Sequence, residues 1–194
     1  MESIEPWAAS SVDQGEVEKQ LASLLGRSFL SWDFLYPDGF GDHRPLHYEG
    51  FDLAEMEVEL AEPNGSSVLF SWQMRGVHEG LAIKFGPPSV GLKPGEPERR
   101  ERGSDALPCN VPITEVAVAW QELDHPSDTA LWSVRLAFEG GQAVTLALGE
   151  PSDSGSTLQY IPDSIVVIFD QQVAKAYRPP ASRESAWGRV IIGS

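Results

Sequence analysis

Residues 55–74 read Glu55-Met-Glu-Val-Glu-Leu-Ala-Glu-Pro-Asn-Gly-Ser-Ser-Val-Leu-Phe-Ser-Trp-Gln-Met74, and this stretch decides the fold class. Apolar and polar side chains alternate on both sides of the turn signal at residues 63–65. Successive side chains of a strand point to opposite faces, so Met56, Val58 and Leu60 face one way and the three neighbouring glutamates the other. The sequence therefore predicts a β-hairpin whose first strand has a solvated acidic face.

The same alternation recurs along the chain and predicts further antiparallel strands. A third strand is expected over 81–85, and a second hairpin joins 132–138 to 144–148 through a Gly-Gly pair. Two more strands are expected over 116–120 and over 165–169, the latter a continuous apolar run suited to the centre of a sheet.

Two helices complete the predicted fold. Asp13 and Glu16 have capping-box spacing, and the apolar residues that follow share one helical face up to Gly26, so an amphipathic helix is expected over about 14–25. Asp170 can cap a short C-terminal helix over 171–177. These elements predict an α+β fold, mainly an antiparallel β-sheet of about six or seven strands in meander hairpins, with one helix near each end of the chain.

The length and composition indicate one domain, 1–194, with a packed core. The chain has 194 residues, of which 41% are apolar. Residues 86–112 lack periodicity and hold six prolines and four glycines, which predicts a mobile loop. The tail from about residue 180 is expected to be loose.

The charge of the chain implies basic partners or none, in which case the charge serves only to keep the protein soluble. The formal net charge is −15, and residues 1–62 carry 14 of the 29 acidic side chains but only 3 of the 14 basic ones. A surface of this sign repels nucleic acid and anionic lipid, so neither is expected as a partner. The only cysteine is Cys109, the N-terminus lacks a secretory pattern, and the longest apolar run is far too short to span a bilayer, so a cytoplasmic protein is expected.

Searches for catalytic and metal-binding patterns predict no catalytic residue, metal or cofactor. Phosphate-binding glycine loops and serine-nucleophile elbows are absent from the sequence. Asp42, His43 and His47 could in principle form a metal site, but Pro45 interrupts their spacing and a polar loop is the favoured interpretation. Cys109 is expected to be a structural thiol rather than a nucleophile.

Residues 32–51 are the strongest candidate for a binding surface, because six of the 18 aromatic residues fall there among acids and turn formers. The alternative is that these rings belong to the core. Together with the acidic strand, this segment predicts the following partner-binding residues: Trp32, Asp33, Tyr36, Asp38, Asp42, Glu55, Glu57 and Glu59.

The leading functional hypothesis is a non-enzymatic domain that binds a basic protein partner through an acidic, aromatic-rich face. An immunity or inhibitor protein for a basic toxin would be one concrete form. Two alternatives stay open: an enzyme or small-ligand-binding domain with a site built from dispersed residues, and an oligomeric scaffold subunit. No motif matches a family whose functional residues could be carried over to this chain.

Overall fold

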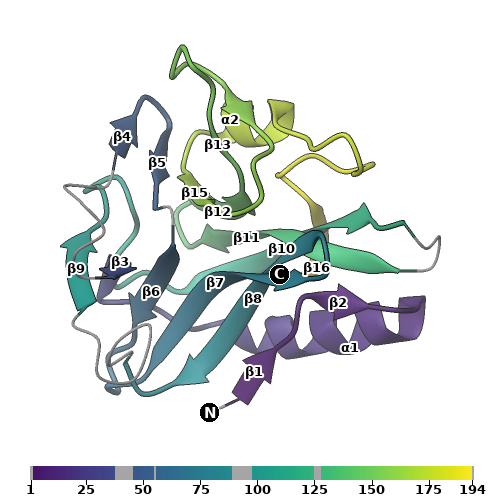
Figure 1. The fold of residues 1–194 in the computed structure, drawn as a ribbon. Helices are drawn as coiled ribbons and strands as arrows, with labels where there is room; N and C mark the ends of the chain where they lie inside the picture. Colours follow the sequence, from purple (N-terminus) through teal and green to yellow (C-terminus); the bar gives the residue numbers. More distant parts are fainter. Residues whose placement is uncertain (1, 38–45, 55, 89–97, 125–127, 194) are drawn as a thin grey trace.

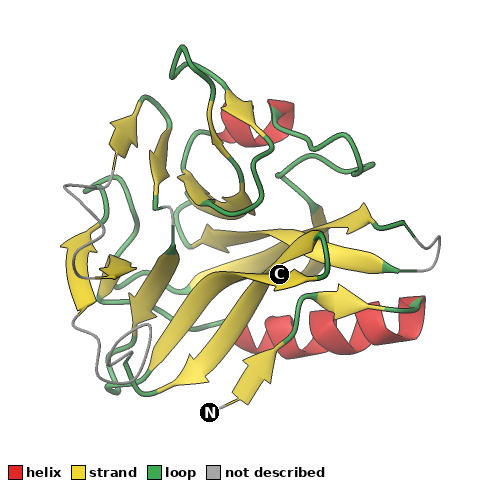
Figure 2. Cartoon of the chain, in the orientation of Figure 1, coloured by secondary structure: helices red, strands yellow, loops and turns green. Residues whose placement is uncertain are grey.

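The computed structural model describes residues 2–37, 46–54, 56–88, 98–124 and 128–193 (Figure 1). About half of the described residues, 49%, lie in strands and 12% in helices (Figure 2). The mainly antiparallel β-sheet is therefore confirmed, but the strands number 16 within the described ranges rather than six or seven, and they form three sheets.

The first sheet has six strands, and every neighbouring pair is antiparallel. Its order is β1 (Glu2–Ile4), β8 (His78–Gly86), β7 (Ser67–Arg75), β6 (Glu57–Ala61), β3 (Ser31–Pro37) and β9 (Glu98–Arg102). The predicted hairpin is confirmed as β6–β7, with Val58 opposite Phe70 and Leu60 opposite Val68. Gly65 in its turn has a φ of 82°, a conformation that glycine adopts without strain.

The second sheet has eight strands. Its main order is β16 (Arg189–Gly193), β10 (Ile113–Glu122), β11 (Thr129–Phe138), β12 (Ala143–Leu148), β15 (Ile165–Ile168), β5 (Phe51–Leu53) and β4 (Leu46–Tyr48), and β2 (Trp7–Ala8) pairs with β11. All four residues of β15 are buried between β12 and β5, as the apolar run predicted. A third, small sheet pairs β13 (Glu150–Pro151) with β14 (Leu158–Gln159).

The predicted meander order is correct only for consecutive hairpins. Strands β6 to β8 and β10 to β12 follow one another, but β3 lies between β6 and β9, and β5 lies beside β15. Such pairings join segments that are far apart in sequence, and local alternation carries no information about them.

The N-terminal helix α1 covers Ser11–Leu21 and continues as a 3₁₀ turn, η1, at Ala22–Leu24. It begins three residues earlier than predicted because Ser10, not Asp13, is its cap: the Ser10 side chain accepts a hydrogen bond from the Asp13 N–H at 3.2 Å. The C-terminal helix α2 covers Gln171–Ala176, and Asp170 caps it as predicted. None of the described helices is long and apolar enough to cross a membrane.

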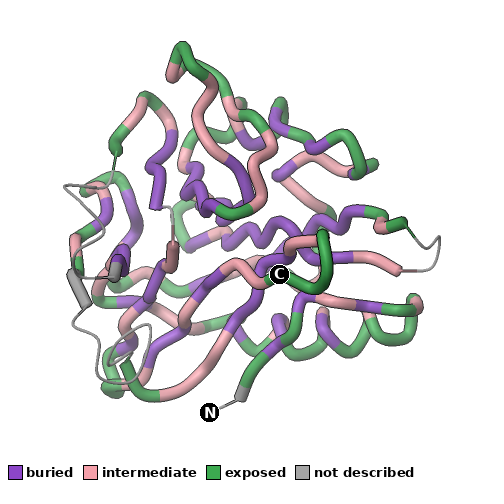
Figure 3. Tube along the Cα trace, viewed as in Figure 1, coloured by how far each residue is buried: buried purple, intermediate pink, exposed green. Residues whose placement is uncertain are grey.

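One continuous cluster of buried apolar side chains joins the first two sheets. The Trp32 ring on β3 meets the Phe138 ring on β11 edge to face, with centroids 6.3 Å apart. Figure 3 shows the buried positions along the central strands, with exposed positions mainly in the connecting turns. In Figure 1, α1 lies at the bottom of the molecule and α2 at the top, with the strands of both sheets between them.

Two segments predicted to be irregular contain regular structure. Residues 98–102 lie within the expected loop at 86–112 but form β9, which pairs with β3 along its whole length. Residues 89–97 of that loop lie outside the described residues. The tail from residue 180 is not loose: Ser182 and Ala186 are buried, and β16 pairs with β10.

Candidate functional site

The two aromatic anchors of the predicted binding face belong to the core. Trp32 and Tyr36 are each only 2% exposed, and the Trp32 indole N–H donates to the Pro108 carbonyl at 2.9 Å. The reason is that residues 31–37 form an interior strand between β6 and β9 rather than a surface loop. The prediction that these rings contact a partner is corrected, and the alternative that they are core is the right one.

The predicted acidic strand face is neutralised from within the chain. Glu59 is 1% exposed, accepts a hydrogen bond from the Ser67 hydroxyl at 2.9 Å and pairs with Arg100 on β9. Asp33 lies 3.2 Å from the same guanidinium. Burial acts to lower the pKa of Arg100, but its hydrogen bonds and charge contacts with Glu59 and Asp33 outweigh burial and raise the pKa above the ordinary value.

Of the remaining predicted contact residues, the structure describes Glu57. Glu57, at the start of β6, is half-buried. Asp38, Asp42 and Glu55 lie outside the described residues, as does His43 of the metal hypothesis. The prediction of a solvated acidic surface on β6 is therefore wrong for Glu59, because the added strand β9 brings a cation onto it.

His47 has an acidic partner that sequence reasoning missed. Its Nδ1 lies 2.8 Å from Oδ1 of Asp52, which is fully buried. The Ser104 N–H donates to the other carboxylate oxygen of Asp52 at 3.1 Å. His47 and Asp52 are cross-strand neighbours in β4 and β5, so this contact ties the hairpin to the segment after β9. Within the described ranges, three or more potential metal ligands do not come together anywhere.

Two cavities of the structure differ in the residues that line them. A cavity of about 270 Å³ beside Trp32 is lined by Cys109, Ser104 and Asp105, and its described lining residues include no histidine that could activate the thiol. A cavity of about 330 Å³ between α2 and the β13–β14 hairpin is lined mainly by Leu158, Val173 and the ring of Tyr177. The Tyr177 hydroxyl already donates to the Leu148 carbonyl at 2.5 Å.

The acids of the N-terminal third divide into those that pair with an arginine and those that are exposed. Six arginines form ion pairs with carboxylates of the same chain, some of them at the surface: Arg27, Arg75, Arg100, Arg135, Arg183 and Arg189. Their partners include several acids of the first 62 residues. Glu5, Asp13 and Glu16 are exposed, in contrast, and have no ion-pair partner among the described residues. We use the name N-terminal acidic surface for these three acids and the exposed Val12, which all lie within residues 5–16.

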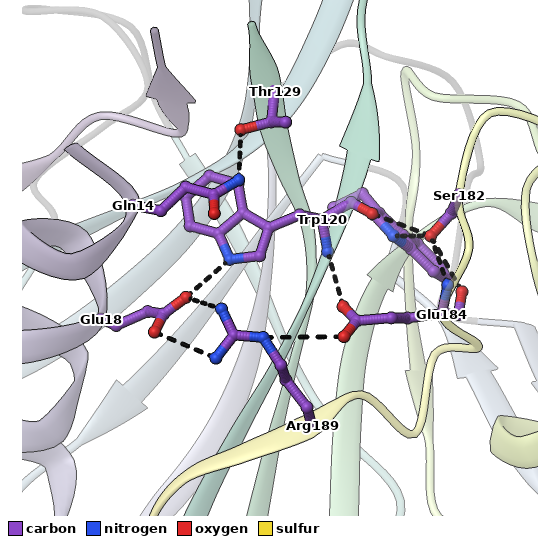
Figure 4. A network of polar contacts seen from close by, with 8 residues as sticks. Gln14, Glu18, Trp120, Thr129, Ser182, Glu184 and Arg189 are labelled. Carbon is purple, nitrogen blue, oxygen red and sulfur yellow. Dashed lines mark hydrogen bonds and ion pairs between the residues drawn. The ribbon is translucent and has the colours of Figure 1, made fainter. Parts of the chain in front are cut away.

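A polar junction lies where α1, the helix of Asp13 and Glu16, meets β10 and the C-terminal segment (Figure 4). Glu18 on α1 accepts the Trp120 indole N–H at 3.0 Å and binds the Arg189 guanidinium through both of its oxygens. On the other side of the guanidinium, Oε1 of Glu184 lies 3.6 Å from the Arg189 Nε.

Further hydrogen bonds join this junction to β11 and to the segment before β16. Gln14 of α1 donates to the Thr129 hydroxyl at 2.8 Å, and Ser182 donates to the Trp120 carbonyl at 2.8 Å. A hollow of about 210 Å³ opens beside these groups, with Glu122 and Arg183 at its edge. The network joins residues more than 100 positions apart, and no local sequence pattern could reveal it.

Comparisons with known protein families, with curated proteins and with solved structures found no match for this chain.

Proposed function

We propose that this protein is a non-enzymatic binding domain that recognises a basic protein partner through the N-terminal acidic surface. An immunity or inhibitor protein that covers a cationic cleft of a toxin is one concrete form of such a domain. The observation that carries the proposal is the distribution of charge: six arginines are engaged by internal carboxylates, while Glu5, Asp13 and Glu16 face solvent without a cation.

The exposed apolar side chain among these acids gives further support. Val12, in the first turn of α1, is 72% exposed. Protein interfaces combine apolar contacts at the centre with charged groups at the rim, and the rim charges steer the encounter of the partners. A partner that places an apolar side chain against Val12 and cations around it would match this surface.

The experiment is a comparison of two charge-reversed proteins. Glu5→Lys with Glu16→Lys changes the net charge from −15 to −11, because each substitution adds two positive charges. The matched control, Glu139→Lys with Asp153→Lys, makes the same change at two exposed positions in other turns of the molecule.

All three proteins are immobilised and exposed to native lysate at low salt, and the captured proteins are identified. The proposal predicts a basic protein that binds the parent and the control but is lost from the Glu5→Lys, Glu16→Lys protein. Equal capture by both variants would show that this surface is not the binding site. Loss from both would show that only the total charge matters.

A further inference from the structure

Strand β16 is an edge strand of the second sheet. It has five residues, and among the described strands it pairs with β10 alone. Arg189, Val190 and Gly193 are exposed, and the register with β10 shifts between Val116 and Ala117. Ile191 and Ile192 are half-buried and pack against the core, but no residue of β16 is fully buried. An edge strand of this kind is less firmly held than a buried central strand.

The Arg189 side chain adds a polar attachment to the pairing of β16 with β10. Its guanidinium is held by Glu18, which is itself fixed by the Trp120 indole N–H. Charge-assisted, paired contacts of this type are the strong class of hydrogen bond. The helix that carries Glu18 is also short, with only Val17 and Leu21 buried in α1. The same contact therefore fastens both elements to the sheet.

Removal of β16 would open an edge of β10. Residues 115–118 of β10 have β16 on one side and β11 on the other. Without β16, their outward N–H and C=O groups would be a template for another strand, as open sheet edges are in general. Glu18 and Glu184 would at the same time lose the Arg189 cation that lies between them.

We propose that β16 is a displaceable strand held closed by the Glu18–Arg189 latch, and that an extended basic segment of the partner adds to β10 in its place. Charge complementarity identifies this occupant: the opened edge has the carboxylates of Glu18 and Glu184 beside it, and Glu18 lies on the same helix as Asp13 and Glu16. The basic character of the occupant rests on the proposed function, whereas the latch does not.

Hydrogen exchange of the intact protein tests the latch. Glu18→Gln removes the carboxylate charge, and Glu16→Gln is the matched control, because Glu16 is exposed on the same helix. The amides of 189–193 should exchange at least about tenfold faster in Glu18→Gln than in the parent, since charge-assisted contacts are lost. Those of 131–136 in β11 should not change. Unchanged exchange at β16, or an equal increase in both strands, overturns the latch.

A reversible lock tests strand addition. Glu115 and Gly193 are direct neighbours across β10 and β16, and a Cβ at Gly193 would lie 3.3 Å from that of Glu115, close to the 3.5–4.5 Å or so of disulfides. Glu115→Cys with Gly193→Cys, in a Cys109→Ser background, can therefore be closed by oxidation and opened by reduction.

The probes are two labelled peptides with the sequence of residues 188–194, one flanked by two lysines and the other by two glutamates. The lysine peptide should bind Glu18→Gln and the reduced lock about tenfold more tightly than it binds the oxidised lock. The glutamate peptide should bind Glu18→Gln and the reduced lock more weakly than the lysine peptide does. Equal binding to both states of the lock, or no binding to Glu18→Gln, overturns strand addition. None of these measurements uses the natural partner, so their failure leaves the charge-reversal result untouched, and the reverse also holds.

Discussion

Replacement of Trp32 by alanine should destabilise the protein by about 4 kcal/mol. The ring is 2% exposed and is surrounded by Phe29, Phe138 and the Pro108 carbonyl. A tryptophan buries roughly 150–250 Å², which at about 25 cal/mol per Å² corresponds to about 4–6 kcal/mol. Measured costs of large-to-alanine changes at aromatic core positions are about 3–5 kcal/mol, and the orphaned carbonyl adds to the cost.

The assay is urea unfolding of Trp32→Ala beside two controls. Trp32→Phe keeps most of the apolar volume but loses the hydrogen bond to Pro108, so a cost of about 1–2 kcal/mol is expected. Trp72→Ala, at a half-buried position on β7, should cost less than Trp32→Ala. A loss below about 1 kcal/mol for Trp32→Ala, with an unchanged dependence on urea, would refute the placement of this ring in the core.

Two further predictions concern charge and pH. Arg100→Gln removes the Arg100 cation from the buried Glu59 and should cost about 2 kcal/mol, less than for a fully buried pair because Arg100 is partly exposed. Adding Glu59→Gln should restore part of the lost stability, and simple additivity of the two costs would contradict the pairing. Burial, aided by the charge of Glu79, raises the pKa of Tyr160 to about 12, against a hydrogen bond from Gln121 that lowers it. The folded state therefore keeps the Tyr160 proton between about pH 10 and 12, where the unfolded chain loses it, so stability should fall as the pH rises through this window, by no more than about 1.4 kcal/mol per pH unit. Urea unfolding at pH 9, 10 and 11 should show a flatter decline for Tyr160→Phe, and the same slope in both proteins would be evidence against the raised pKa.

Sequence patterns predicted the elements that depend on local order. The hairpins β6–β7 and β11–β12, the buried strand β15 and the Asp170 cap all follow from alternation, turn residues and capping chemistry within a few positions. Alternation did not reveal the register shift between Ala119 and Trp120, which leaves Trp132 without a direct partner on β10. The Trp132 side chain is nevertheless buried in the core, and its indole N–H donates to the Ser182 hydroxyl of the C-terminal segment at 3.0 Å. An irregularity of this kind adds one residue to a strand, and alternation alone does not locate it.

The predicted binding face failed for a reason of topology. The glutamates of 55–60 do alternate, but the face that carries Glu59 is covered by Arg100, a residue 41 positions away in a segment rich in charge and expected to be a loop. The same segment covers β3 and makes it an interior strand, so Trp32 and Tyr36 are core. The excess of acidic over basic residues could be counted in the sequence. Which acids stay exposed depends on which of them form ion pairs with arginines, and the sequence does not show that.

The proposed recognition of a basic partner is tested most directly by its association rate at two salt concentrations. The captured partner is passed over the immobilised parent, the Glu5→Lys, Glu16→Lys protein and the Glu139→Lys, Asp153→Lys control at about 50 mM and about 300 mM salt, where screening differs strongly. For the parent and the control, association should slow about tenfold between the two concentrations. The Glu5→Lys, Glu16→Lys protein should associate slowly at both. Equal association rates for all three proteins, independent of salt, would contradict the claim that the N-terminal acidic surface recognises the partner.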